Sequence, residues 1–267
     1  MKLNDFTSIG RPIDPAYPTN RWLLIILLAV FFLGLALQKL LGTSTQAACL
    51  WALRADLVLF FSWALCRELD PDDELAAFLA LVLAAPMLAW VAPGTGHLFW
   101  LLCTVRLVNR TTGLAPTWID SAIVLALAWA THSGVLLLLT SLSFGLDSTL
   151  RGGQRRQILF SVVALTLAAL TRWPAVSHLA EGAGALLIAG AFQLTFARVV
   201  PTACGDCDSN PVDAMRVRSA TGVALIAGIA IVLTEPQGVP ETVPLWAAAL
   251  ASILYRARMY LGTGRNL

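Results

Sequence analysis

Residues 75–105 read LAAFLALVLAAPMLAWVAPGTGHLFWLLCTV, a stretch without a single Lys, Arg, Asp or Glu. About 20 apolar residues in a helix span the hydrocarbon core of a bilayer, so a run of this length is typical of membrane-crossing segments. Further runs without formal charge occupy residues 22–37, 121–146, 157–171, 182–197 and 219–234. This repetition predicts an all-α fold, a polytopic bundle of helices embedded in a membrane.

The composition excludes an ordinary soluble protein. Hydrophobic residues make up 58% of the 267 residues and charged residues only 13%, so a soluble domain of this size would lack polar surface. A net charge of +2 provides no basic surface for nucleic acid, and we expect no nucleic-acid partner. We expect a cytoplasmic tail over residues 1–20, one transmembrane domain over 21–267, and the lipid bilayer as the main partner.

Helix boundaries are marked by capping residues, proline and glycine. Asp70-Pro71 and Asn210-Pro211 combine an N-cap with proline at the first helical position, and Thr117 and Asp120 have the spacing of a capping box. Thr242 is a further expected cap. We predict ten helices, over residues 21–41, 47–68, 71–91, 96–109, 117–131, 134–149, 155–173, 177–199, 211–234 and 243–261.

The pair 117–131 and 134–149 is short for two crossings and leaves an alternative open. It could be one long helix broken near residues 131–134, which would give nine helices. The positive-inside rule distinguishes the two counts, because cytoplasmic loops carry an excess of Lys and Arg. A nine-helix chain would move every charge after residue 144 to the other side, including Arg151, Arg155 and Arg156.

Ten crossings with a cytoplasmic N-terminus collect most basic residues on one side, and only Lys39, Arg54 and Arg172 fall elsewhere. This uneven distribution of basic residues between the two sides favours ten crossings, or eight crossings with a re-entrant hairpin at 117–149. The basic residues on the predicted cytoplasmic side are Lys2, Arg11, Arg21, Arg67, Arg106, Arg110, Arg151, Arg155, Arg156, Arg198, Arg216, Arg218, Arg256, Arg258 and Arg265.

Ionisable residues within membrane segments are costly and are candidates for function. On the predicted outer side they are Arg54, Asp56, His132, His178 and Glu181, and we interpret these five as a substrate or proton pathway. His178 and Glu181 are three residues apart and share a helix face. An equally simple interpretation is that the helix-terminal members only face headgroups and water.

A denser set of charges lies on the predicted inner side. Carboxylates close to arginines could hold a phosphate-bearing lipid, and the alternative catalytic set there is Glu68, Asp70, Asp73, Arg106 and Arg110. The same residues also have structural explanations, because acids cap helices and favour their first turns, while arginines anchor cytoplasmic ends.

The sequence offers no strong metal or cofactor motif, and we predict neither a metal site nor a cofactor. Cys204 and Cys207 form the only CxxC pair, without a second pair or a neighbouring histidine.

The hypothesis that follows is a multi-pass inner-membrane protein that transports a small solute or an ion. The alternative is a membrane-embedded enzyme acting on a lipid or lipid-linked substrate at the cytoplasmic face, and a third interpretation is a scaffold without a site. Discontinuous helices such as 117–149 are a device of transporters. Substrate, coupling ion and oligomeric state are left open by the sequence.

Overall fold

The computed structural model describes residues 6–11, 13–89, 96–197, 199–206, 210–235 and 237–263, apart from the side chains of 262 and 263. Within these residues the fold is all-helical, as predicted, with ten α-helices and no β-strand. The helices are α1 (Pro18–Leu40), α2 (Thr45–Leu69), α3 (Glu74–Ala84), α4 (Gly96–Asn109), α5 (Trp118–Ala130), α6 (Gly134–Thr149), α7 (Arg156–Leu170), α8 (Leu179–Phe196), α9 (Ala214–Thr234) and α10 (Gly238–Thr263). A 3-10 turn, η2 (Ala85–Ala89), prolongs α3.

Helices α5 and α6 are separate, and the single broken helix is excluded. His132 adopts a left-handed backbone conformation, with φ of 53°, in the turn between them. Ser121, in the first turn of α5, bonds Gln157 at the start of α7, whereas Gly134, at the start of α6, bonds Arg172 beyond the end of α7. The two helices therefore run in opposite directions as a hairpin.

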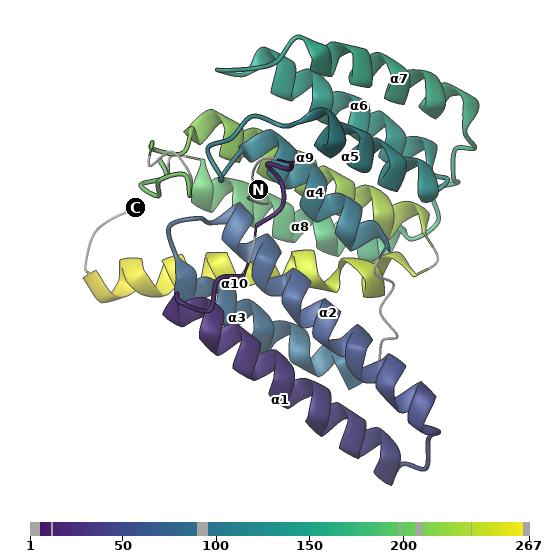
Figure 1. Ribbon diagram of the computed structural model, residues 1–267, viewed down its shortest axis with the longest axis vertical. Helices are drawn as coiled ribbons and strands as arrows, with labels where there is room; N and C mark the ends of the chain where they lie inside the picture. Colours follow the sequence, from purple (N-terminus) through teal and green to yellow (C-terminus); the bar gives the residue numbers. More distant parts are fainter. Residues whose placement is uncertain are drawn as a thin grey trace.

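Successive helices alternate in direction between two ends of the molecule (Figure 1). At one end, Arg110 bonds the carbonyl of Gly152, which joins the α4–α5 loop to the α6–α7 loop. At the opposite end, Ser177 bonds the carbonyl of Leu233, which joins the α7–α8 loop to the end of α9. We call the first of these the arginine-rich end, because arginines at the end of α2, in the α4–α5 and α6–α7 loops and in the first turn of α9 lie there, among them Arg67, Arg110, Arg151 and Arg216.

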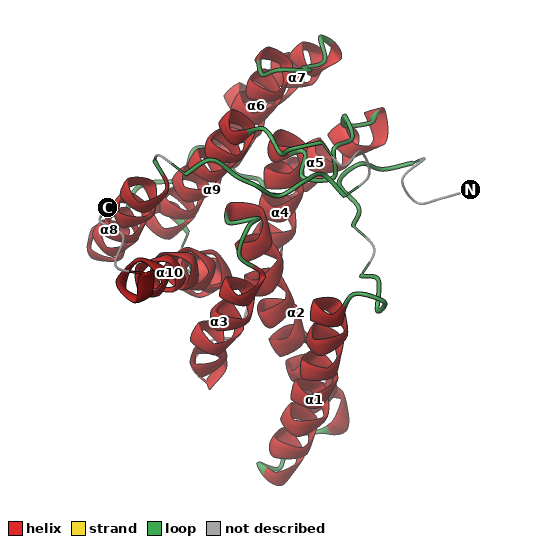
Figure 2. Ribbon diagram, turned by 90° about the vertical axis from the view of Figure 1, so that its left-hand side faces the viewer, coloured by secondary structure: helices red, strands yellow, loops and turns green. Residues whose placement is uncertain are grey.

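Among the described residues, four helices are long and apolar enough to cross a membrane: α1, α2, α8 and α9. Helix α1 packs along α2 and projects from the body of the molecule (Figures 1 and 2). Its large side chains, such as Leu28 and Leu33, are 61% and 71% exposed. Such an uncovered apolar surface is expected of a helix that faces lipid.

The core lies between α2, α3, α4, α9 and α10, which contact one another. Small buried residues such as Ala76, Ala80, Ala224 and Ala248 let these helices approach closely. This packing fixes the ends of α2, α4 and α10, from which the polar residues of the site project.

Four predicted helix starts differ from the structure by three residues or more. Helix α1 begins at Pro18 rather than residue 21. Helix α3 begins at Glu74 rather than residue 71, because the Asp70 carboxylate pairs with Arg256 instead of capping a helix. Helix α9 begins at Ala214, with Asp213 as its cap, rather than at Pro211. Helix α10 already begins at Gly238 and continues through Pro244. The Thr117 capping box is confirmed.

Candidate functional site

The N-terminal segment, residues 6–11, lies across the arginine-rich end and is held by side chains from two loops. The Asp120 carboxylate, in the first turn of α5, accepts hydrogen bonds from the Thr7 hydroxyl and from the Ser8 hydroxyl and backbone N–H. Thr112 donates to the Ser8 carbonyl over 3.0 Å. Asp120 therefore serves two purposes, because it also closes the capping box of α5.

Glu68, in the last turn of α2, is the centre of a buried polar network. Its side chain is fully buried, and its Oε1 accepts from Arg106 Nε at 2.8 Å and from Arg11 Nη1 at 3.2 Å. Its Oε2 accepts from Asn109 at 2.8 Å and from Thr111 at 2.7 Å. Four donors from α4, its following loop and the N-terminal segment compensate the cost of burying this charge.

Asp147, near the end of α6, forms a second buried centre. Arg110 donates to both of its oxygens, from Nε at 2.9 Å and from Nη2 at 2.8 Å, and Arg216 of α9 donates at 2.8 Å. Bidentate arginine–carboxylate pairs are among the strongest hydrogen-bonded contacts. Asp147 thereby ties α6 to α4 and α9.

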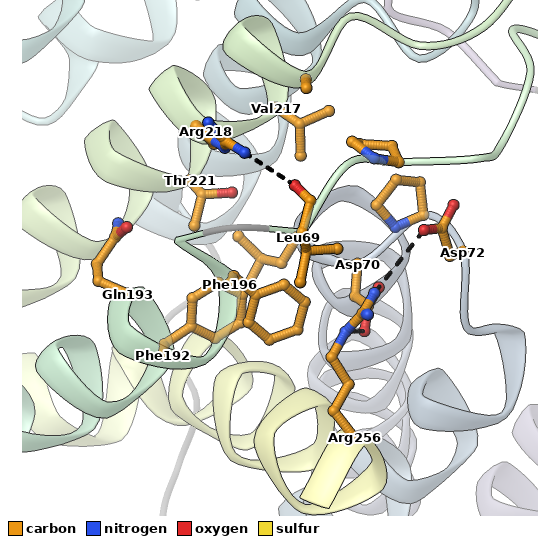
Figure 3. Close-up of a pocket in the computed structure, with 14 residues that line it drawn as sticks. Leu69, Asp70, Asp72, Phe192, Gln193, Phe196, Val217, Arg218, Thr221 and Arg256 are labelled. Carbon is orange, nitrogen blue, oxygen red and sulfur yellow. Dashed lines mark hydrogen bonds and ion pairs between the residues drawn. The ribbon is translucent and has the colours of Figure 1, made fainter. Parts of the chain in front are cut away.

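A third cluster joins the α2–α3 loop to α10 (Figure 3). The Arg256 guanidinium lies 2.5 Å from Asp70 Oδ1 and 4.5 Å from the centre of the Phe196 ring. Burial raises the pKa of Asp70 to about 6, although Arg256 acts to lower it. Burial also raises the pKa of Asp73, whose Oδ2 lies 3.6 Å from Arg256.

The five residues of the predicted inner set all lie at the arginine-rich end, but in three different clusters. Glu68 and Arg106 are in direct contact, Asp70 and Asp73 surround Arg256, and Arg110 belongs to Asp147. Among the described residues, no side-chain hydrogen bond or ion pair joins these three groups. The sequence did not single out four further members of the networks, which are Arg11, Asp147, Arg216 and Arg256.

The sequence did contain a signal for one of these four residues, Asp147. Asp147 is the only acid between residues 121 and 150, so it was an ionisable residue at the edge of an apolar run. Arg11, Arg216 and Arg256 carried no comparable signal, since each is equally well explained as an anchor at the cytoplasmic end of a helix. Their partners are far away in the sequence and are brought close only by the tertiary fold.

A cleft of about 470 Å³ opens beside the Glu68 network. One wall comes from α2, where Phe60, Trp63 and Arg67 follow one another on one helix face. The remaining lining residues come from the chain before α1, the first turn of α1, the start of α3, the end of α4 and three connections. They are Gly10, Arg11, Ile13, Asp14, Tyr17, Thr19, Asn20, Pro71, Glu74, Arg106, Thr112, Ala203, Cys204 and Asp206.

The predicted outer set is dispersed. Arg54 and Glu181 are exposed, and so is His132, whose ring centre lies 6.4 Å from that of Trp129. Asp56 is partly buried, and its Oδ1 has no hydrogen-bond partner among the described residues. His178 is partly buried at the start of α8.

The structure shows no contact between any two of these five side chains, within its described residues. The third histidine, His97, instead pairs through Nδ1 with Glu241 at 2.5 Å. The described residues contain no group of three or more His, Cys, Asp or Glu side chains placed to hold a metal ion. Cys204 is exposed at the arginine-rich end, and Cys207 lies outside the described residues.

No family model matches this chain, and no similar curated protein or solved structure is found.

Proposed function

We propose that the protein is a multi-pass membrane protein whose arginine-rich end, with both termini, faces the cytoplasm. The support is the agreement between helix direction and charge: loops that alternate along the chain meet at one end, and the arginines lie there. An excess of arginine at one membrane face is typical of the cytoplasmic side. In a bacterial cell this corresponds to the inner membrane.

We further propose that the protein acts on a lipid or lipid-linked substrate at this face. The observation that carries the proposal is the 470 Å³ cleft, whose α2 wall changes from apolar Phe60 to cationic Arg67 within two helical turns. Binding sites combine an apolar lining with a few placed polar groups. A scaffold without a ligand would need no such cleft.

Within this proposal, the predicted catalytic set takes different roles. Arg106 lines the cleft and could contact a substrate, while Glu68 holds Arg106 and Arg11 in place from behind. Asp70, Asp73 and Arg110 do not line the cleft, and we assign them to the packing of α10 and α6 against the α2–α3 and α4–α5 loops.

Photolabelling tests whether a lipid occupies the cleft. The full chain in proteoliposomes is labelled with a phospholipid that carries a diazirine near its headgroup, with and without an excess of unlabelled phospholipid. We expect labelling of the peptide containing Trp63 to saturate and to be competed. Labelling at Leu187, a lipid-facing residue of α8 that is 75% exposed, provides the unsaturable background. Equal, unsaturable labelling at both places would contradict the proposal.

Transport of an ion or small solute is a second proposal, supported by Asp56. Its side-chain Oδ1 is buried and has no hydrogen-bond partner among the described residues, and it lies in α2, an apolar helix long enough to cross the membrane. An intramembrane carboxylate of this kind is a typical carrier of a proton or a cation.

Electrophysiology on solid-supported proteoliposome membranes, over a panel of inorganic ions and small solutes, tests this second proposal. We expect a substrate-induced current that Asp56→Asn abolishes and Glu235→Gln, a carboxylate outside the predicted pathway, retains. A current that is the same in wild type and Asp56→Asn would exclude Asp56 from any pathway.

A further inference from the structure

We infer that the cleft binds a zwitterionic phospholipid headgroup, in which a phosphodiester is joined to an ammonium group. The inference rests on the proposed lipid site and names the class of lipid that fits its charges. It follows from the order of groups along α2, from one indole N–H without an acceptor, and from the balance of charges around the opening.

The first argument is the order of side chains on α2. Phe60, Trp63 and Arg67 are spaced by three and four residues and therefore share a helix face, over an axial rise of roughly 10 Å. The Phe60 and Trp63 rings lie 6.4 Å apart, and the Arg67 guanidinium lies 5.9 Å from the Trp63 ring. Moving outward, the wall is first apolar, then aromatic with a donor, then cationic. A phospholipid has the same order, from acyl chain through ester to phosphate.

The second argument is the Trp63 indole. Trp63 is 8% exposed and lines the cleft, and its Nε1–H has no acceptor among the described residues. A buried donor without a partner is costly, and a tryptophan in this position normally finds an acceptor. An ester carbonyl or phosphodiester oxygen of a bound lipid would supply it.

The third argument is that the arginines around the cleft differ in availability. Arg106 pairs with the fully buried Glu68, and Arg11 pairs with both Glu68 and Asp206. Among the described residues, Arg67 has a single ion pair, with Glu74 at 2.6 Å, and the Glu74 side chain is 49% exposed. A phosphodiester could therefore take the place of Glu74 on Arg67 without breaking the buried network.

When a phosphodiester replaces Glu74 on Arg67, the Glu74 carboxylate loses its cation. It then lies at the mouth of the cleft together with the carboxylate of Asp14, and both residues are exposed. An anionic headgroup without an ammonium would meet these negative charges uncompensated. An ammonium group next to the phosphodiester would neutralise them instead. Three arginines and three carboxylates line the cleft, and Glu68 behind it pairs with two of those arginines, so a ligand that brings an ammonium group with its phosphodiester fits these charges better than an anion alone.

Native mass spectrometry of the purified full chain in detergent tests this inference. The protein is incubated with phosphatidylethanolamine, phosphatidylglycerol or phosphatidic acid with the same acyl chains, and in a separate arm with glycerophosphoethanolamine, which has the headgroup but no acyl chains. We expect at least fivefold greater occupancy by phosphatidylethanolamine than by either anionic lipid. We expect Arg67→Gln and Trp63→Phe each to reduce that occupancy severalfold. Arg155→Gln, an exposed arginine at the same end but outside the cleft, should leave it unchanged.

Three outcomes distinguish a failure of the zwitterionic headgroup from a failure of the proposed lipid site itself. Preferred binding of phosphatidylglycerol or phosphatidic acid that still depends on Arg67 and Trp63 would overturn the zwitterion and keep the lipid site. Binding of every lipid without regard to Arg67 and Trp63 would overturn both. Binding of glycerophosphoethanolamine as tight as that of the whole lipid would show that the ligand is a soluble phosphodiester and would also overturn the lipid assignment.

Discussion

Glu68 is the residue whose loss the structure most clearly predicts to be harmful. We expect Glu68→Gln to lower the free energy of unfolding by about 3–5 kcal/mol, because it leaves the partly buried Arg106 guanidinium without its carboxylate and removes one of the two carboxylates that pair with Arg11. Denaturant titration in mixed micelles, followed by circular dichroism, measures this. The same substitution at half-exposed Glu74 should cost no more than about 1 kcal/mol. Equal losses at the two positions would contradict the role given to the network.

Asp70 carries a prediction about pH. Burial raises its pKa to about 6, above its usual value of 3.8, so between these values the folded protein binds more protons than the unfolded chain. The contribution of this carboxyl to stability is therefore greatest below about pH 4 and declines as pH rises to about 6. The shift of roughly two units corresponds to a loss on the order of 3 kcal/mol.

The Asp70→Asn variant keeps Arg256, Asp72 and Asp73, which surround the carboxyl, but has no group that titrates at position 70. The difference in stability between wild type and this variant therefore reports the titration of Asp70. Unfolding free energies at pH 4, 5, 6 and 7 should show wild type losing stability relative to the variant as pH rises. A wild type that gains stability relative to the variant over the same range would mean that the Arg256 ion pair outweighs burial and depresses the pKa.

At the scale of elements, the contact of α1 with α2 depends on a glycine. A Cβ at Gly34 would lie 2.8 Å from Cζ3 of Trp51, so only glycine lets the two helices approach this closely. We expect Gly34→Leu to destabilise the protein by about 1–3 kcal/mol through overpacking. The same change at Gly190 of α8, where no atom lies within 4 Å of a Cβ, should alter stability by no more than about 0.5 kcal/mol. Thermal unfolding of both variants in one detergent measures the difference.

The existence of all ten helices could be predicted from the sequence, because uncharged runs and capping residues are local signals. Helix starts failed where a tertiary contact takes the capping residue, as Arg256 takes Asp70. The polar contacts of the arginine-rich end could be predicted in part, since Glu68 and Arg106 are in direct contact. The separation of Asp70 and Arg110 into other clusters could not be predicted, because long-range packing decides which arginine each carboxylate reaches. In the part of the chain that the structure describes, no hydrogen bond or ion pair joins the five predicted outer residues, since the sequence places them on one side without fixing the distances between them.

For the whole molecule, the orientation in the membrane decides which face the cleft opens to. Helix α7 is a demanding crossing, since its 15 residues extend only about 22 Å against a hydrocarbon core of about 30 Å. Its two ends can be tested separately, because Arg155 lies just before it and Val176 lies beyond it, and both are exposed. Single cysteines at these positions, in a chain whose native cysteines are replaced by alanine, report their sides of the membrane.

We expect a membrane-impermeant maleimide to label Val176→Cys in intact cells and to label Arg155→Cys only after permeabilisation. The physical reason is that the arginines near residue 155, among them Arg110, Arg151 and Arg216, would be retained on the cytoplasmic side. Labelling of both cysteines in intact cells would mean that α7 does not cross the membrane, and the eight-crossing arrangement with a re-entrant segment would then need revision as well. The reverse pattern would place the cleft, and any lipid it binds, at the outer face.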